Sequence, residues 1–285
     1  MTAVILDGLV LGLQFGLLGV GMTLVYGLGG VLNLAYGQIA VIAAILVANA
    51  MAAGVPAVPA AAVGLLAGAG VGLVLDRSLM QAVYRRQGEH RVLLGLLLTL
   101  GVAIAVDGLL QWRYPLGALR LAIGGDPISI LGVGMRTGSL LASGISLCVG
   151  VALVVFLRAT TLGRATRSVI QDEVGARLVG ISPPRVRAFI FGLSGAMAGL
   201  VAVTRSMTSP VTVTAGVNFT ILALIVAVVG GLGSVSGAFL AGVLLGIVST
   251  VSAFYIGQYI TTIVLLTAAA ATILVRPRGL LGRPG

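Results

Sequence analysis

The side chains that can make charged contacts are concentrated in one stretch, RATTLGRATRSVIQDEVGARLVGISPPRVR, from Arg158 to Arg187. This segment holds six of the seventeen arginines and two of the seven acidic residues, and it lies between segments that are almost wholly apolar. Charged side chains are seldom buried without a partner, so such a segment is expected to meet water or another protein. We interpret residues 158–187 as a cytoplasmic docking segment built around a helix.

Local signals predict the bounds of this helix. Thr160 or Thr161 can cap its N-terminus, because a hydroxyl there accepts a hydrogen bond from a first-turn amide. Gly180 followed by Pro183 predicts its end, since glycine tolerates the left-handed cap and proline cannot continue a helix. Ser182 and Pro183 then open the next helix. Apolar residues at helical spacing predict one buried face, formed by Leu162, Ala165, Val169, Ala176 and Val179.

The polar residues of the segment predict a second, exposed face. Arg164, Arg167 and Gln171 share this face, and Asp172 interrupts the apolar stripe, so the helix is moderately amphipathic. Glu173 precedes Arg177 by four residues, which is the favourable order for a helical ion pair. The alternative is a solvated connector whose arginines serve as topology markers. The close succession of helix, stop and helix favours the docking interpretation.

Few other residues are suited to chemistry. The chain has no lysine, which excludes a GK[ST] phosphate loop and a Schiff-base lysine. The single histidine, His90, lies in a basic loop where a surface role is expected, and the single cysteine, Cys148, excludes an internal disulfide. Asp107 is the acid nearest the interior of an apolar run. This scarcity disfavours an ion-coupled transporter and a membrane enzyme.

The composition sets the fold class. Hydrophobic residues make up 59% of the chain and charged residues 8%. Repeated apolar runs of about 20 residues indicate membrane helices. We therefore expect an all-α, polytopic membrane bundle in one domain, residues 1–285, with eight or nine crossings. The runs are Leu9 to Gly30, Val31 to Ala53, Ala60 to Leu75, Val92 to Trp112, Gly138 to Leu157, Ala188 to Thr204, Val217 to Val229, Val235 to Tyr255 and Tyr259 to Val275. The run from Val217 is short enough that it need not span.

The arginines predict the orientation. Four lie in loops on one side, Arg113, Arg120, Arg136 and Arg205; the other thirteen lie on the opposite side, in residues 76–91, in residues 158–187 and near the C-terminus. The positive-inside rule places this arginine-rich side, with the C-terminus, in the cytoplasm. With nine crossings the N-terminus lies outside. No basic residue precedes Asp7, so the first run is expected to be retained rather than cleaved. The net charge of +10 is assigned to topology and lipid headgroups, not to nucleic acid.

Glycines repeat at four-residue spacing within the runs, which predicts closely packed helices. The series are Gly8, Gly12 and Gly16; Gly64, Gly68 and Gly72; Gly195 and Gly199; and Gly242 and Gly246. Two further glycine clusters, Gly27 to Gly30 and Gly230 to Gly237, predict broken helices, and paired breaks indicate a substrate route. The polar residues around the first break are candidates for lining it: Gln14, Thr23, Tyr26, Asn33 and Gln38. The alternative is that they form hydrogen bonds between helices.

Several of these motifs carry a resemblance. GLLGVGMTLVYGLGGVLNLAYGQIAVI, from Gly16 to Ile42, resembles the start of permease subunits of branched-chain amino-acid ABC importers, the Liv-type family. Tyr36 and Gln38 stand where that family usually carries histidine and glutamate. Three further stretches are similar to the family: LGRATRSVIQDEVGARLVGI from Leu162, FGLSGAMAGLVAV from Phe191 and VGGLGSVSGAFLAG from Val229.

The resemblance implies a half-transporter in the bacterial inner membrane. It would pair with a second permease subunit, as a heterodimer, with two cytoplasmic ATPases that hydrolyse the ATP, and with a periplasmic binding protein. This chain itself would hold no cofactor. The coupling helix would present Arg164, Arg167, Gln171, Asp172, Glu173 and Arg177 to an ATPase, and the loop from Arg113 to Thr137, with Arg120, Asp126 and Arg136, would meet the binding protein. The alternative function is a passive channel for a small polar solute such as urea or amides, which would work without ATP.

Overall fold

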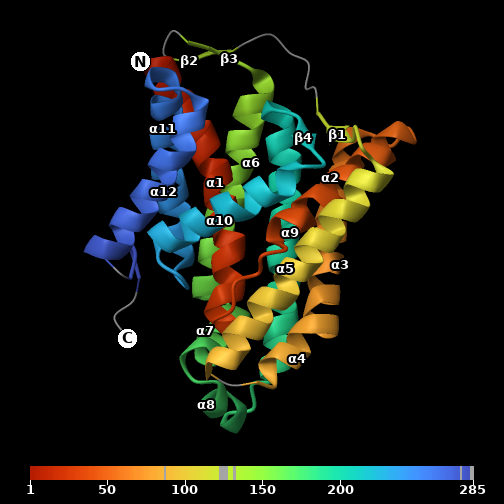
Figure 1. Ribbon diagram of the computed structural model, residues 1–285, viewed down its shortest axis with the longest axis vertical. Coiled ribbons are helices and arrows are strands. Elements are labelled where there is room, and N and C mark those ends of the chain that lie inside the picture. Colours follow the sequence, from red (N-terminus) through yellow and green to blue (C-terminus); the bar gives the residue numbers. More distant parts are fainter. Residues whose placement is uncertain (87, 122–127, 131–132, 277, 283–285) are drawn as a thin grey trace.

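The chain forms a bundle of long helices (Figure 1). The computed structural model describes residues 1–86, 88–121, 128–130, 133–276 and 278–282. Asp126, predicted to meet the binding protein, and Arg283, one of the thirteen arginines predicted on the cytoplasmic side, lie outside the described residues. The helices are α1 (Thr2–Gly29), α2 (Tyr36–Ala52), α3 (Ala57–Leu75), the π-helical η1 (Asp76–Met80), α4 (Gln81–Tyr84), α5 (Gly88–Arg113), α6 (Thr137–Ala159), α7 (Thr161–Gln171), α8 (Glu173–Leu178), α9 (Pro183–Thr208), α10 (Ala215–Gly230), α11 (Val235–Tyr255) and α12 (Gln258–Val275).

The nine predicted apolar runs all appear as helices. In the described part of the chain, seven helices are long and apolar enough to cross a membrane, and α2 and α10 are shorter apolar helices of 17 and 16 residues. The polytopic helical prediction is confirmed, and so is the shortness of the run from Val217. The N-terminus and the α7–α8 pair lie at opposite ends of the bundle (Figure 1).

Three predicted boundaries were wrong. Helix α1 begins at Thr2 rather than Leu9, and residues 31–35 form a loop, so α2 begins at Tyr36 rather than Val31. The third helix does not stop at Leu75, because η1 and α4 extend it to Tyr84 and absorb much of the predicted hydrophilic loop. A π-helical turn continues the backbone hydrogen bonding through this polar sequence, so the helix needs no break there.

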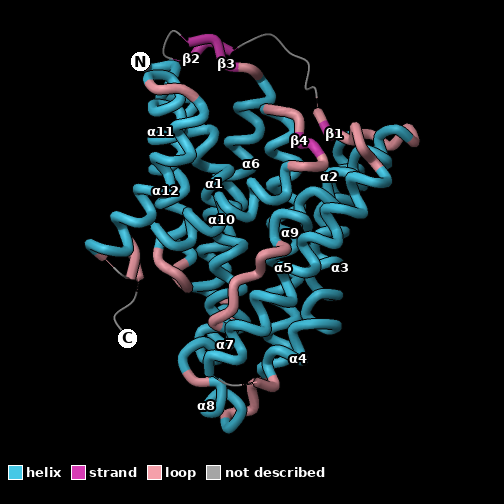
Figure 2. Tube along the Cα trace, in the orientation of Figure 1, coloured by secondary structure: helices cyan, strands magenta, loops and turns pink. Residues whose placement is uncertain are grey.

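Two pairs of short strands lie at the end of the bundle that holds the N-terminus (Figure 2). Strand β1 (Ala118–Leu119) pairs antiparallel with β4 (Val211–Thr212), and β2 (Ile128–Ile130) pairs antiparallel with β3 (Val133–Met135). The apolar periodicity of the sequence predicted helices alone, and such short pairs carry no periodic signal. The β1–β4 pair joins the ends of loops that are far apart in the sequence.

The glycine series pack helix against helix, as predicted. A Cβ atom added to Gly68 would lie 2.2 Å from the carbonyl oxygen of Gly195, and one added to Gly195 would lie 2.1 Å from that of Gly68. The same closeness joins α1 to α11, where a Cβ on Gly246 would lie 2.1 Å from the Cα of Gly12. Backbones this close leave no room for side chains between them. Small residues therefore fix two of the helix pairs.

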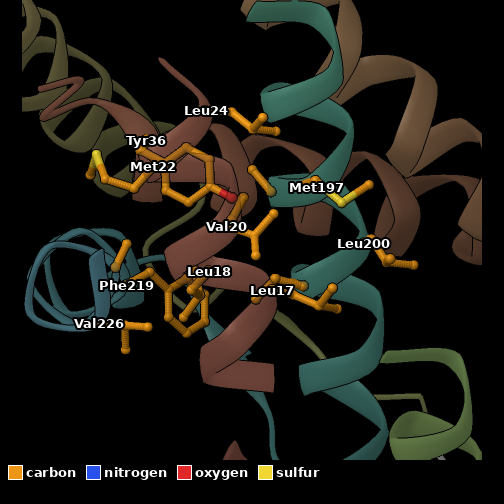
Figure 3. Close-up of a cluster of buried hydrophobic side chains, with 14 of the residues drawn as sticks. Leu17, Leu18, Val20, Met22, Leu24, Tyr36, Met197, Leu200, Phe219 and Val226 are labelled. Atoms are coloured by element: carbon orange, nitrogen blue, oxygen red, sulfur yellow. The ribbon is translucent and has the colours of Figure 1, made fainter. Parts of the chain in front are cut away.

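An apolar core fills the middle of the bundle. Leu17 and Leu18 of α1 are 0% and 2% exposed, and they pack among apolar side chains of α9 and α10. Figure 3 shows these leucines together with Leu200 of α9 and Phe219 of α10. The core takes in much of the second half of α1, from Phe15 to Leu28.

Candidate functional site: the α7–α8 end and the polar interior

The α7–α8 pair forms the end of the molecule opposite the N-terminus (Figure 1). Its predicted caps are confirmed. The Oγ1 atom of Thr160 accepts a hydrogen bond from the Gly163 amide at 3.1 Å, which caps α7. Gly180 has the left-handed φ of 82° that ends a helix, and Pro183 is the first residue of α9. The segment therefore begins, stops and continues into the next helix at the predicted residues.

The prediction of one continuous helix across this segment was wrong. Asp172 is extended, with φ −152° and ψ 107°, and it separates α7 from α8. Its Oδ1 atom accepts a hydrogen bond from the Val174 amide at 2.9 Å, so aspartate ends one helix by capping the next. The break redirects the chain. Val169 and Ala176 are buried as predicted, whereas Val179 is 75% exposed.

Two arginines tie the pair to the long helices. Arg167 of α7 donates a hydrogen bond from Nη1 to the carbonyl oxygen of Leu157, at the end of α6, at 2.6 Å. Glu173 of α8 accepts hydrogen bonds from Arg177 at 2.6 Å and from Arg187 of α9 at 2.9 Å. Arg187 is 7% exposed, and its guanidinium carbon lies 4.3 Å from the ring centre of Tyr84. Arg167 therefore anchors α7 to α6, and Glu173 anchors α8 to α9, in addition to any contact they make at the surface.

The anchor at Glu173 predicts a pH dependence. Partial burial raises the pKa of this carboxyl, but the hydrogen bonds and charges of Arg187 and Arg177 outweigh the burial and hold the pKa below its usual value. A lowered native pKa stabilises the fold above the unfolded pKa of about 4.3, and the stabilisation is lost as the pH falls through the native pKa. Glu173→Gln is expected to cost about 1–3 kcal/mol at pH 7, since it leaves the buried Arg187 without its carboxylate. Thermal unfolding of the variant and of the unaltered chain in detergent, from pH 7 down to pH 3, measures the loss of stability.

The matched control is Glu89→Gln, a change at an exposed carboxylate in the first turn of α5. The control is expected to unfold like the unaltered chain at every pH. The difference between Glu173→Gln and the unaltered chain should shrink as the pH falls below about 4. An undiminished difference at pH 3 would contradict the role of the carboxylate charge.

The outer surface of the pair combines polar and apolar side chains. Arg164, Gln171, Asp172 and Arg177 are exposed, as a docking surface requires. Three apolar residues beside them are exposed as well: Val179, predicted to be buried, and Val174 and Leu178, which the sequence did not single out, with exposed fractions of 75%, 67% and 84%. The signal that could have found them is the Val174–Leu178 spacing of four residues, which places both on one face of α8. Large exposed apolar groups rimmed by charges are typical of protein contact sites.

The five polar residues predicted around the first glycine break are not gathered at one point. Gln14 is 1% exposed and borders a cavity of about 500 Å³ near the N-terminal end of the bundle. Thr23 is 1% exposed and borders a second cavity of about 500 Å³ between α1, α6, α7 and residues 232–236. Tyr26 is half-buried. The two cavities border different parts of α1, one at Gln14 and the other at Thr23 and Leu24.

Asn33 and Gln38 hold the break itself together. The Asn33 Oδ1 atom accepts a hydrogen bond from the Ala35 amide at 3.1 Å, and the Thr220 hydroxyl of α10 accepts one from the Gly37 amide at 2.9 Å. Gln38 donates from Nε2 to Asp107 Oδ1 at 3.2 Å. The bonds of Gln38 and of the Gly37 amide join α2 to α5 and α10, whereas the bond of Asn33 is local to the loop. The second glycine cluster lies close by, since a Cβ on Gly27 would be 3.6 Å from the Cα of Gly233.

Comparison with known proteins agrees with this architecture. A family model described as the branched-chain amino acid transport system / permease component matches residues 4–275. The high-affinity branched-chain amino acid transport system permease protein BraD of Pseudomonas aeruginosa is 28% identical, over 98% of this chain and 95% of that protein. LivH of Escherichia coli K12, a permease protein of the same description, is 26% identical over 98% and 94%.

A solved structure is similar in fold. It is PsaBC from Streptococcus pneumoniae in complex with Fab, with a TM-score of 0.51 and 13% identity over 95% of this chain and 91% of that one. At this identity the likeness concerns the fold. The family match covers almost the whole bundle, from the first turns of α1 to the end of α12. The chain is a multi-pass membrane protein and belongs to the permease component family of branched-chain amino acid transport systems.

Proposed function

We propose that this chain is one permease subunit of an ATP-driven importer for branched-chain or related amino acids. It would pair with a second permease subunit, two cytoplasmic ATPases and an external binding protein, in the bacterial inner membrane with its C-terminus in the cytoplasm. The observation that carries the proposal is the α7–α8 end. An exposed apolar and charged surface there is tied by Arg167 and Glu173 to the ends of α6 and α9.

This anchoring supports a mechanism for coupling. A push on α8 reaches α9 through the Glu173–Arg187 ion pair, and a push on α7 reaches α6 through the bond from Arg167 to Leu157. Helices α6 and α9 are long rigid elements, so displacement of one end moves the whole helix. A closing pair of ATPases would therefore move the walls of both cavities without contacting them.

The two cavities support an alternating route. One borders Gln14 and the other borders Thr23, which lies nine positions further along α1, or about 14 Å. Leu17 and Leu18, which belong to the buried core, lie between these two positions on α1. In this proposal the solute enters one cavity, and movement of α6 and α9 opens the core toward the other.

Charge reversal at Arg164 tests the coupling surface. Arg164→Glu is expected to lower ATP-driven leucine uptake about fivefold, the ratio that corresponds to 1 kcal/mol, because an exposed ion pair contributes at most about that much. Arg167→Glu is expected to have the larger effect, since it also removes the anchor to Leu157. The variant that carries both Arg164→Glu and Arg167→Glu should still insert in the membrane. Uptake is measured in proteoliposomes that contain the whole transporter with its own ATPases.

Arg86→Glu is the control, because Arg86 is an exposed arginine on the same arginine-rich side and its reversal changes the net charge equally. It should transport normally. Normal ATP-driven uptake in the Arg164→Glu, Arg167→Glu double variant would remove the coupling assignment. Leucine uptake that proceeds without ATP would instead favour the passive channel.

A further inference from the structure

A charged side chain faces the cavity at the N-terminal end without a charged partner. Arg205 of α9 lines this cavity, and its Nη1 atom donates a hydrogen bond to Gln14 Oε1 at 3.3 Å. Both ion pairs found among the described residues belong to Glu173, at the other end of the molecule. The sequence predicted a loop at Arg205, but the residue lies in the last turn of α9, at the end of the bundle that holds the N-terminus, and it is half-buried there. A guanidinium group that is half-buried beside a cavity, with no carboxylate paired to it, is able to bind an anion that enters the cavity.

The position of Gln14 directs the guanidinium group. Its Nε2 atom donates to the carbonyl oxygen of Thr204 at 3.3 Å and to Thr208 Oγ1 at 3.5 Å. These bonds turn the Gln14 Oε1 atom toward Arg205, and this oxygen accepts from one of the two Nη atoms of the guanidinium group. A guanidinium group has five N–H donors in a planar fork that matches the two oxygens of a carboxylate. The remaining donors of Arg205 are therefore suited to a carboxylate that enters the cavity.

The cavity is of the right size and polarity for a small acid. Its volume is about 500 Å³, and α1, α6, α9 and α11 contribute to its walls. Hydroxyl groups of Ser139, Thr208 and Ser249 line it. Its charged lining residues are Arg205, Arg136 and Asp7, of which Arg136 and Asp7 are exposed. The lining thus carries two positive charges and one negative charge, which favours an anionic group.

We infer that Arg205 and Gln14 form a subsite that binds the carboxylate of the transported solute. This inference rests on the proposed function and narrows its substrate class to carboxylate-bearing amino acids, in contrast to urea or amides. Gln14 holds the guanidinium in place, and Arg205 makes the contact with the solute. Loss of one charge-assisted bidentate contact corresponds to about 10- to 100-fold weaker binding.

A labelling experiment tests the subsite without measuring transport. Cys148→Ser removes the native thiol, and Ser139→Cys places one at the cavity. The assembled transporter is treated in membrane vesicles with a methanethiosulfonate reagent, with and without L-leucine or L-leucinamide. Leucine should slow the labelling, and leucinamide, which lacks the carboxylate, should not. With Arg205→Gln, about 10- to 100-fold more leucine should be needed for the same protection.

Two variants separate binding from structure. Arg205→Lys keeps the charge and should retain part of the protection, whereas Arg86→Gln, at an exposed arginine that lines neither cavity, should retain nearly all of it. Three results would each overturn the subsite. Leucine and leucinamide could protect equally, leucine could protect the Arg205→Gln variant fully, or leucine could fail to protect the chain that keeps Arg205. Leucine uptake driven by ATP in the same vesicles is scored separately. Uptake without protection rejects the subsite and leaves the importer, and absence of ATP-driven uptake rejects the importer.

Discussion

Replacing Leu178 with aspartate is expected to weaken ATPase binding about 10- to 100-fold and to abolish most ATP-driven uptake. Leu178 is 84% exposed at the end of α8, and Val174 is 67% exposed one turn before it. Burying one such side chain in a partner groove contributes about 1.5–3 kcal/mol, and the aspartate would add a desolvation cost. Copurification of the ATPases, titrated with purified ATPase, measures the loss.

The fold of the permease should survive this change, since Leu178 is mostly exposed in the chain itself. Leu116→Asp is the matched control, because Leu116 is 96% exposed and follows the end of α5 at the opposite end of the bundle. The control should bind ATPase as the unaltered chain does. Unchanged ATPase affinity in Leu178→Asp would mean that α8 does not seat in the ATPase.

Replacing Gly68 with alanine is expected to destabilise the bundle by about 1–3 kcal/mol. The new Cβ atom would lie 2.2 Å from the carbonyl oxygen of Gly195, and both backbones are held by long helices. The contact can be relieved when α3 and α9 move apart, which would disturb the neighbouring Gly64 and Gly72 contacts as well. Thermal unfolding of the purified chain in detergent measures the loss.

The control lies in the same helix. Gly70 has nothing within 4 Å of an added Cβ, so Gly70→Ala should leave the stability unchanged or raise it by about 0.5–1 kcal/mol, since alanine favours helix over glycine. The two substitutions are chemically identical and differ in which face of α3 they occupy. Equal stabilities of the two variants would contradict the close α3–α9 contact.

The sequence predicted the helices and their packing faces because these depend on periodic features. Long apolar runs must be helices in lipid, and the four-residue glycine spacing of Gly64, Gly68 and Gly72 placed them on one face. The caps at Thr160 and Gly180 were predictable because each depends on the local chemistry of a few residues. Those predictions needed no knowledge of contacts distant in the sequence.

The errors occurred where distant contacts decide the local structure. Asp172 reads equally as a polar residue inside a helix or as a cap between two helices, and nothing local decides between the two; the ion pair of the next residue, Glu173, with Arg187 of α9 is a distant contact that no spacing rule indicates. The pairing of Arg205 with Gln14 joins residues 191 positions apart, and no spacing rule indicates it. The exposed Leu178 was missed because an apolar residue in an amphipathic pattern reads as buried.

The start of α2 has a further consequence for the bilayer. Each backbone amide from Leu34 to Ile39 has a partner within the protein: the Thr99 hydroxyl, the side chain and carbonyl of Asn33, the Thr220 hydroxyl, and the Ala35 carbonyl for the last two. Donors that are paired within the protein do not need water or lipid headgroups as partners. The first turn of α2 can therefore begin at a depth where the bilayer supplies no hydrogen-bond acceptors.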